Sequence, residues 1–385
     1  MNDCCNISNT QDKHLVIIGG GSAAFSAALK ASELGHRATI INAGLPTGGT
    51  CVNVGCVPSK FLIRAAEQLH CSNHARFFGI EVGGRLASFR ELIAEKRSLV
   101  EELRQAKYIN VIADAPGIRL IEGKGRLLDS RTVEVNGERL AADAILIATG
   151  VRPSIPPIPG LVESGYLTNE SLFELDALPE SLIVLGGRYV ALECAQMMAR
   201  LGSRVTALQR SERILPTESA DITEALADYL RGEGVNIITG VAIHEVRRNG
   251  NLVNVRATVD GKEQNFQSTH LLAATGRKPN TAGMELEKAS VPLDEKGFVR
   301  IDEHLETGAP GIFAAGDVIG ENQFVYTAAY EGALAAENAL IGANRERDYT
   351  ALPWVVFTDP QVAGVGLDED QARKIGIDAE SSTLP

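Results

Sequence analysis

A glycine-rich strand–turn–helix pattern near the start of the chain constrains its fold more than any other feature. Residues 14–18 form a short run typical of a buried strand, and Gly19-Gly20-Gly21-Ser22-Ala23-Ala24 follows at once. An Ala-rich helix pattern then runs to Gly35, and a second strand is expected over 38–42. Gly19, Gly21 and Ala24 occupy the small positions of a dinucleotide-binding fingerprint, in which a pyrophosphate rests on the helix N-terminus. The pattern predicts a Rossmann-like unit.

A second unit of the same kind begins near residue 181. A strand pattern over 181–185 leads into Gly186-Gly187-Arg188-Tyr189-Val190-Ala191, followed by a helix to about 201 and a strand over 203–209. Arg188 stands where the fingerprint expects its second glycine. Two such units predict the fold class: an α/β protein with two Rossmann-like dinucleotide-binding domains.

Both fingerprints lack the acidic residue that usually ends the second strand and accepts hydrogen bonds from a ribose. Asn42 takes its place in the first unit and Gln209 in the second. An amide still accepts a hydrogen bond, so Asn42 predicts a weaker adenosine contact rather than a lost site. After Gln209 come Arg210 and Arg213, and a 2′-phosphate needs positive charge there. The second site therefore favours NADPH over NADH.

Two cysteines with four residues between them follow the first unit. Cys51 and Cys56 lie in a Gly-rich stretch that continues through Pro58 to Lys60. This spacing lets the thiols close a small, strained and easily reduced ring. A structural disulfide belongs mainly to secreted chains, and a structural zinc site needs about four ligands, for which no second pair has suitable spacing. The stretch predicts a redox-active pair beside an electron-carrying cofactor.

Composition limits the partners. The 385 residues are 44% hydrophobic and 22% charged, with a net charge of -12, which argues against nucleic acid or an anionic membrane as a main partner. The polar residues 1–13 do not resemble a signal peptide, and the apolar run 15–29 is broken by glycines and serines. We expect no stable membrane insertion. Six cysteines without a secretory signal predict a cytoplasmic location.

Other cysteines and histidines have weaker interpretations. Cys4-Cys5 is interpreted as incidental rather than as an ion-capturing pair, although the alternative stays open. His70, Cys71 and His74 have metal-ligating side chains, but their pattern favours a polar helix end.

These motifs resemble those of the class I pyridine nucleotide–disulfide oxidoreductases, the family of glutathione reductase and dihydrolipoamide dehydrogenase. The resemblance covers residues 15–385 and is strongest to members that reduce mercuric ion. It rests on the stretch from Cys51 to Lys60 and on the segments 106–108, 156–160, 323–326 and 357–363.

The resemblance implies a role for each motif residue. Cys56 would lie against the isoalloxazine ring of FAD, Cys51 would be the outer thiol, and both would bind Hg(II), a soft ion suited to thiolates. Lys60 and Glu193 would pair beside the reactive flavin nitrogen, and Tyr189 would cover the nicotinamide pocket. The residues expected at FAD are Gly19, Gly21, Ala24, Asn42, Gly49, Thr50, Lys60, Thr149, Gly150 and Asp317. Those expected at NADPH are Gly186, Arg188, Gln209, Arg210, Arg213 and Gly276.

The implied domains are discontinuous. Near-repeats at 144–150 and 271–277 mark crossings between the two cofactor domains. The expected parts are a tail over 1–13, an FAD domain over 14–152 and 281–350, an NADPH domain over 153–280, and the start of a C-terminal α+β interface domain over 351–385. Because the rest of that domain would supply a dimer contact and metal-delivering cysteines, we expect a homodimer of the full-length protein and poor Hg(II) reduction by this piece alone.

The implied activity passes electrons from NADPH through FAD and the Cys51/Cys56 pair to Hg(II), giving Hg(0). One alternative is an NAD(P)H-dependent disulfide reductase acting on a substrate such as glutathione disulfide or lipoamide. A redox sensor without turnover is another, and the intact Cys51, Cys56, Lys60 and Glu193 argue against it.

Overall fold

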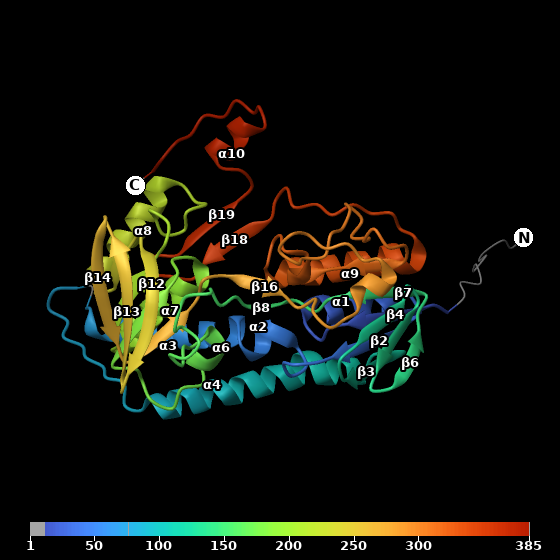
Figure 1. Ribbon diagram of the computed structural model, residues 1–385, viewed down its shortest axis with the longest axis horizontal. Helices are drawn as coiled ribbons and strands as arrows, with labels where there is room; N and C mark the ends of the chain where they lie inside the picture. The colour runs from blue at the N-terminus through green and yellow to red at the C-terminus, as the bar shows by residue number, and fades with distance from the viewer. Residues whose placement is uncertain (1–11, 76, 385) are drawn as a thin grey trace, which may run out of the picture. The chain divides into compact units, whose positions relative to one another are not determined.

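The computed structural model describes residues 12–75 and 77–384 and divides the chain into two units (Figure 1). Each unit contains one parallel sheet that carries one of the glycine fingerprints. Unit 1 comprises Met1–Val57, Ser98–Arg152 and Arg277–Arg347, and unit 2 comprises Pro58–Arg97, Pro153–Gly276 and Asp348–Pro385.

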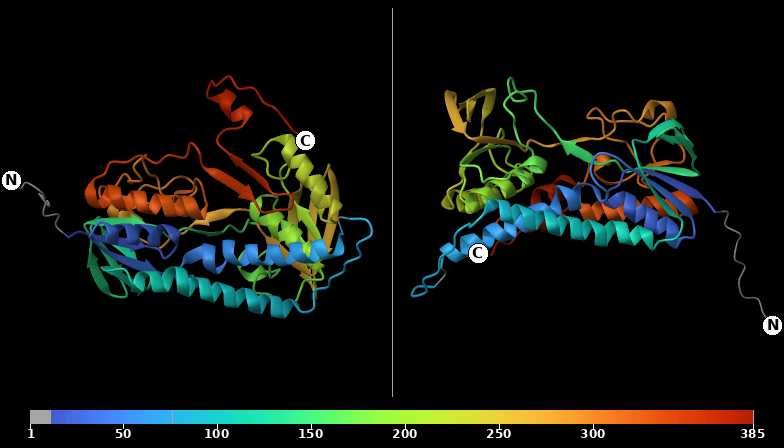
Figure 2. Two further views of the ribbon diagram at one scale, coloured as in Figure 1. Left: turned by 180° about the vertical axis from the view of Figure 1, so that it is seen from behind. Right: turned by 90° about the horizontal axis from the view of Figure 1, so that it is seen from below.

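Unit 1 is built on a five-stranded parallel sheet of order β17-β7-β1-β2-β3. Its central strand is buried at every residue from Leu15 to Ile18, as expected for a parallel strand covered on both faces. Helices α1 and α9 pack against each other, and they lie together in both views of Figure 2 (blue and orange). The elements are β1 (His14–Ile18), α1 (Ser22–Glu33), β2 (Arg37–Asn42), β3 (Ile118–Glu122), β7 (Ala144–Ile147), β17 (Ile312–Ala314) and α9 (Val325–Ile341).

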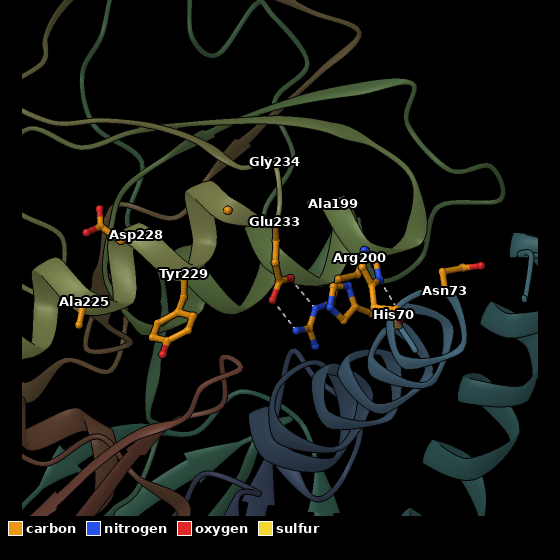
Figure 3. A pocket seen from close by; sticks show the side chains of 11 residues that line it. His70, Asn73, Ala199, Arg200, Ala225, Asp228, Tyr229, Glu233 and Gly234 are labelled. Carbon is orange, nitrogen blue, oxygen red and sulfur yellow. Dashed lines mark hydrogen bonds and ion pairs between the residues drawn. The ribbon is translucent and has the colours of Figure 1, made fainter. Parts of the chain in front are cut away.

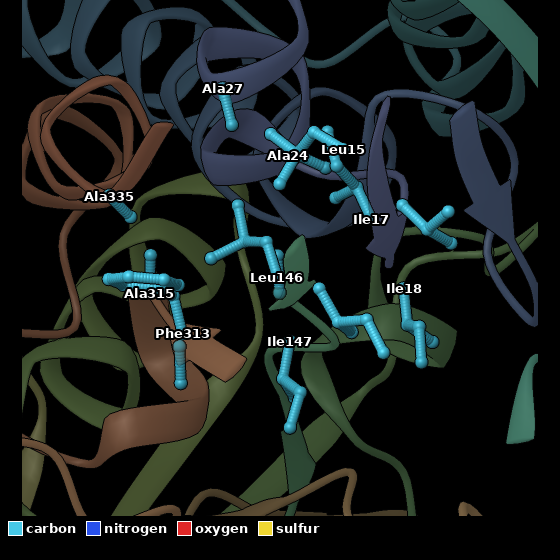
Figure 4. Packing of buried hydrophobic residues seen from close by; sticks show 14 of the residues in the cluster. Leu15, Ile17, Ile18, Ala24, Ala27, Leu146, Ile147, Phe313, Ala315 and Ala335 are labelled. Carbon is cyan, nitrogen blue, oxygen red and sulfur yellow. The ribbon is translucent and has the colours of Figure 1, made fainter. Parts of the chain in front are cut away.

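Branched side chains of the strands and small side chains of the helices form the core of unit 1 (Figure 4). Ile17 and Leu146 belong to neighbouring strands, while Ala24 and Ala27 face them from α1. Small residues let the two helices approach closely: a Cβ added at Gly332 of α9 would lie 2.1 Å from the carbonyl oxygen of Ala23. This packing fixes the first turn of α1 against the sheet edge.

The remaining elements of unit 1 surround this sheet. They are α2 (Gly49–Asn53), the π-helical turn η1 (Gln105–Ile109), α5 (Asn110–Ala113), the antiparallel sheet of β4 (Arg126–Asp129), β5 (Thr132–Val135) and β6 (Glu138–Ala141), β16 (Arg277–Pro279), and the 3-10 turns η2 (Leu286–Ala289) and η3 (Gly316–Ile319). Three elements have residues in both units: α3 (Cys56–Asn73), α4 (Phe89–Arg104) and β8 (Val151–Pro153), which pairs with β16.

Unit 2 is built on a four-stranded parallel sheet of order β11-β10-β9-β15. The antiparallel sheet β12-β13-β14 contacts strands β9 and β15, and buried Val246, Val253 and Val255 share a core with Ile183 and Leu271. The elements are α6 (Asn169–Leu172), β9 (Ser181–Leu185), α7 (Tyr189–Leu201), β10 (Arg204–Leu208), α8 (Ala220–Gly232), β11 (Asn236–Ile238), β12 (Ala242–Asn249), β13 (Leu252–Val259), β14 (Lys262–Ser268), β15 (His270–Ala273), β18 (Pro353–Val356), β19 (Val362–Val365) and α10 (Glu369–Lys374).

The predicted fold class is confirmed, and both fingerprints lie between a parallel strand and a helix. The segment 351–385, expected to start an α+β domain, holds two antiparallel strands, β18 and β19, and the helix α10. One boundary differs from the sequence interpretation. Residues 58–97, expected within 14–152, group with unit 2, because Leu62, Ala66 and Ile93 are buried in its core.

Across residues 12–75 and 77–384, no helix has both the length and the apolar character needed to cross a bilayer. Residues 1–11, with Cys4 and Cys5, lie outside the described part of the chain.

Candidate active site

The first fingerprint turn has a geometry that suits a diphosphate. Gly19 has a φ of +132°, and a Cβ there would lie 2.1 Å from the carbonyl oxygen of Ala148, so the position requires glycine. Gly21 is the N-cap of α1 and has no side chain to bond the first helical N–H groups. These groups, with the positive end of the helix dipole, suit a phosphate anion.

Polar groups at the ends of two further strands of unit 1 suit the rest of a dinucleotide. Thr149 follows β7, and its buried Oγ1 has no hydrogen-bond partner among the described residues. Asp317 lies just after β17 and pairs with Arg277 at 3.1 Å. Burial raises the pKa of Asp317, and the Arg277 charge opposes that rise. An unpaired hydroxyl and a sheltered carboxyl fit a ligand rich in hydroxyl groups, such as FAD.

The cysteine segment lies directly against the fingerprint turn. The Gly48 N–H donates to the Gly20 carbonyl at 2.8 Å, and a Cβ added at Gly49 would lie 2.7 Å from the Cα of Gly21. Helix α2, which starts at Gly49, therefore begins directly beside the fingerprint turn. The structure brings together predicted residues that are 28 positions apart, from Gly21 to Gly49.

Cys51 and Cys56 occupy two consecutive helices. Cys51 lies in α2 and Cys56 is the first residue of α3, and both side chains are half-buried. Gly55 closes the turn between them tightly, since a Cβ there would lie 2.9 Å from the Thr50 carbonyl oxygen. The positive end of α3 favours a thiolate at Cys56.

Tyr108 lies near the thiols, and no role was predicted for this residue. Its ring meets Phe25 edge-on, with centroids 4.9 Å apart. Burial raises the pKa of Tyr108, a hydrogen bond with Ser22 opposes this, and negative charge at Cys51 and Cys56 raises it further. Tyr108 therefore lies within electrostatic reach of both sulfurs. In the sequence, the segment 106–108 contributes only to the family resemblance.

Lys60 and Glu193 form an ion pair inside unit 2. Lys60 Nζ donates to Glu193 Oε2 at 2.8 Å, and the backbone N–H of Phe357 donates to Glu193 Oε1 at 3.0 Å. The ammonium group also lies 4.3 Å from the centroid of the Phe357 ring. Glu193 is buried on α7, so Lys60, one turn after Cys56 on α3, is held by a fixed carboxylate.

Tyr189 begins α7. Its ring stacks with Trp354 of β18 at 6.0 Å, and its hydroxyl donates to Glu218 Oε1 at 3.4 Å. The aromatic pair and the carboxylate position the ring beside the second fingerprint turn; its role over a nicotinamide stays a prediction.

The second fingerprint turn repeats the geometry of the first. Gly186 has a φ of +126°, and a Cβ there would lie 2.4 Å from the Ala274 carbonyl oxygen. Arg188 is the N-cap of α7, and its side chain makes no capping bond within the described structure. Gln209 is buried against Gly187, whose added Cβ would lie 3.0 Å from it. This cradle also suits a dinucleotide phosphate.

The charged residues after the second turn are accessible. Gln209 Nε2 donates to the Arg213 carbonyl at 3.3 Å, the Arg213 side chain is half-buried, and Arg210 is exposed. Gly276, predicted at this site, has open space around its Cα and accepts from the Ser154 N–H at 2.9 Å.

A groove of about 920 Å³ in unit 2 lies among α3, α7 and α8 (Figure 3). His70 and His74 stack on one side of it with ring centroids 4.1 Å apart, and the His74 Nδ1–H donates to the His70 carbonyl. Buried Arg200 bridges Glu233 and Asp359 beneath them. Burial and the Arg200 charge lower the pKa of His70.

The groove contains none of the predicted catalytic residues. Within residues 12–75 and 77–384, no set of three or more His, Cys, Asp or Glu side chains is placed to hold a metal ion. The chelating alternative for His70, Cys71 and His74 therefore has no support in this part of the chain.

Comparisons with known proteins agree with this geometry. Residues 13–332 match the family described as pyridine nucleotide-disulphide oxidoreductase. The chain is 44% identical to mercuric reductase from Staphylococcus aureus, an alignment that covers 97% of this chain and 68% of the relative. It is also 44% identical to mercuric reductase from Streptomyces lividans, with 96% and 79% covered.

Among solved structures, the chain resembles the Cu(II) complex of the HOCl-induced flavoprotein disulfide reductase RclA from Escherichia coli. The TM-score is 0.83 at 32% sequence identity, and the match covers 95% of this chain and 80% of the other.

Proposed function

The chain belongs to the pyridine nucleotide-disulphide oxidoreductase family, and on this premise we propose that it is an FAD-dependent enzyme that uses NADPH to reduce Hg(II) to Hg(0). One observation carries the proposal: the cysteine segment touches the dinucleotide turn through Gly48–Gly20 and Gly49–Gly21. A redox-active sulfur pair beside a flavin is what the reaction needs. The curated relatives at 44% identity are mercuric reductases.

The residues of unit 1 fit FAD, and those of unit 2 fit a pyridine nucleotide. FAD would rest on the Gly19–Gly21 turn, with Thr149 and Asp317 towards its hydroxyl groups. When bound, the two cofactors supply hydride acceptance and electron transfer. Arg210 and Arg213 offer positive charge to a 2′-phosphate, and the neutral Gln209 does not repel it, which supports NADPH over NADH.

The thiol pair binds the substrate. Cys51 and Cys56 as thiolates hold Hg(II), because a soft cation prefers sulfur ligands. Overall, NADPH loses a hydride and becomes NADP+, Hg(II) gains the electron pair and becomes Hg(0), and one proton is released. The neutral atom has little affinity for thiolates and leaves. Negative charge at Cys51 and Cys56 also raises the pKa of the partly buried Tyr108, so we place its neutral hydroxyl among the groups that surround the thiol pair.

Lys60 supplies fixed positive charge one helical turn after Cys56. Residues four positions apart on a helix share a face, so the ammonium group and the Cys56 sulfur belong to the same side of α3. Glu193 holds Lys60 in place. We assign the pair to stabilising negative charge on the reduced cofactor, and Tyr189 to covering the nicotinamide.

The proposal is tested by mercury release. The purified protein, loaded with FAD and supplied with NADPH and excess small thiol as a metal carrier, should release Hg(0) vapour as NADPH is oxidised, with one mercury atom per NADPH and at the low rate expected for these 385 residues alone. Cys51→Ser and Cys56→Ser should abolish release, while the matched control Cys71→Ser, an exposed cysteine on the same helix as Cys56, should not change it. Vapour that persists in both active-site variants would contradict the role of the pair.

A second candidate function is reduction of a disulfide, favoured by the likeness to the flavoprotein disulfide reductase RclA. The same preparation should then oxidise NADPH faster with glutathione disulfide or lipoamide than with Hg(II). The mercuric proposal predicts the opposite order. The homodimer of the full-length protein, which the resemblance implies, and the cytoplasmic location, which the cysteine content favours, belong to the proposal. Ultracentrifugation of the full-length protein tests the first of them.

A further inference from the structure

The amide that ends the second strand of the first fingerprint has a carboxylate beside it. Asn42 is the last residue of β2, and its Cα partner on the neighbouring strand is Glu122, the last residue of β3. In open parallel sheets, ligands bind outside the carboxyl ends of the strands. Glu122 therefore stands at the edge of the sheet where the first fingerprint binds its dinucleotide, one strand away from the usual acidic position.

Hydrogen bonds hold the Glu122 carboxylate in place. Asn42 Nδ2 donates to Oε2 at 2.9 Å and to Oε1 at 3.2 Å, and Thr47 Oγ1 donates to Oε1 at 2.9 Å. Asn42 itself is 3% exposed and packs on the glycine turn, since a Cβ added at Gly20 would lie 2.1 Å from its Oδ1. The carboxylate is thus anchored to a residue that touches the fingerprint.

The carboxylate keeps the capacity to accept one further donor. An ionised carboxylate has about four acceptor sites, two on each oxygen. The bonds from Asn42 and Thr47 use both sites of Oε1 and one of Oε2, so one site of Oε2 stays open, and the Glu122 side chain is exposed. A sugar hydroxyl, which donates a hydrogen bond, suits an oriented carboxylate of this kind.

The second fingerprint lacks this arrangement. Gln209 follows β10, but the residue across from the end of that strand is Ile238 of β11, which is apolar. The Gln209 amide turns instead to the Arg213 carbonyl. The first fingerprint, where FAD with an unphosphorylated ribose is expected, therefore has a carboxylate on the neighbouring strand. The second fingerprint, where the 2′-phosphorylated ribose of NADPH is expected, has an apolar residue at the corresponding position.

We propose that Glu122 accepts a hydrogen bond from a hydroxyl of the adenosine ribose of FAD, so that β3 supplies the carboxylate that β2 usually carries. Asn42 and Thr47 are then positioning residues that orient it. This inference rests on the proposed function, because it assigns FAD to unit 1. It replaces the weaker adenosine contact expected from Asn42 alone.

The test measures FAD affinity of the flavin-free protein by quenching of flavin fluorescence. Glu122→Gln keeps the size of the side chain and removes its charge, and should weaken FAD binding about tenfold, as expected for a lost charged hydrogen bond. An FAD analogue with a 2′,3′-dideoxyadenosine should bind the variant and the wild type equally. The matched control Glu138→Gln, which removes the charge of an exposed carboxylate of unit 1 paired with Arg119, should change FAD affinity less than about threefold.

A relocation variant separates binding from folding. In Asn42→Glu/Glu122→Gln the carboxylate returns to β2, and FAD affinity should recover to within about threefold of the wild type. Urea unfolding of the flavin-free Glu122→Gln protein should match that of the wild type, which a merely structural role would not allow.

The outcomes are distinguishable. Suppose that the wild type binds FAD. If Glu122→Gln binds FAD equally well, or if the substitution weakens binding of the dideoxy analogue by the same factor as binding of FAD, the role of Glu122 is overturned while the proposed function stands. If the wild type binds no FAD, both fail.

Discussion

Removal of the Glu193 carboxylate should destabilise unit 2 by an amount that depends on what replaces it. Glu193 accepts from Lys60 at 2.8 Å and from the Phe357 N–H at 3.0 Å, and its side chain is 9% exposed while that of Lys60 is 33% exposed. Exposed pairs contribute up to about 1 kcal/mol, and breaking fully buried pairs costs about 3–5 kcal/mol. Because Lys60 is partly exposed, we expect the contribution of this pair to the free energy of unfolding to be close to that of an exposed pair.

The two informative variants are Glu193→Gln and Glu193→Ala. Glutamine loses the charge but still accepts from Phe357, and Lys60 keeps its contact with the Phe357 ring, so we expect a loss of about 1 kcal/mol. Alanine also leaves the Phe357 N–H without this acceptor and removes buried methylenes, so we expect a loss of about 3 kcal/mol. The corresponding shifts in the unfolding temperature are about 2–4 °C and 6–12 °C.

Calorimetry and urea unfolding measure both variants against Glu33→Gln, which removes the charge of an exposed helical pair with Lys30 and should cost less than about 0.5 kcal/mol. The Glu193 variants should change the urea midpoint without changing the slope. Equal losses for glutamine and alanine, or an alanine variant as stable as the wild type, would refute the assignment of the stabilisation to this carboxylate.

Three other predictions concern the glycine turn, the groove and the nucleotide. Gly19→Ala should yield protein that retains no flavin after gel filtration, because its Cβ would overlap the Ala148 carbonyl; retention of flavin would contradict the turn geometry. Because burial and Arg200 lower the pKa of His70 below its ordinary 6.5, the unfolded chain binds more protons, and stability should fall as pH drops below 6.5. His70→Gln should flatten that dependence in urea unfolding measured from pH 7 to 5. Arg210→Ala/Arg213→Ala should lower the kcat/KM preference for NADPH over NADH at least about tenfold, and an unchanged ratio would place the phosphate elsewhere.

Local patterns predicted the parts of the fold that depend on neighbouring residues. The turns at Gly19 and Gly186 have the expected strand before them and helix after them, because the need for glycine is set by a close approach of the backbone within a short segment. The Lys60–Glu193 pair, 133 residues apart, was expected only through the family resemblance, since no periodicity joins α3 to α7.

Other parts of the site depend on contacts that a sequence does not display. Glu122 lies beside Asn42 because of the parallel register of β2 and β3, which are separated by 75 residues. A single charged residue at the end of a strand does not indicate in the sequence which strand it will pair with. Tyr108 reaches the cysteines by packing on Phe25 and Gly48. The grouping of 58–97 with unit 2 follows from apolar residues such as Leu62 and Ile93, whose partners are chosen by the tertiary fold.

The most direct test of the central claim is an anaerobic reductive titration of the purified flavoprotein. If Cys51 and Cys56 exchange electrons with the flavin, the wild type should take up about four electrons per FAD, two for the cofactor and two for the disulfide, and each Cys→Ser variant only about two. A long-wavelength thiolate–flavin absorbance should persist in Cys51→Ser and vanish in Cys56→Ser. Uptake of only two electrons by the wild type would contradict the account, and the reverse spectral pattern would exchange the roles of the two thiols.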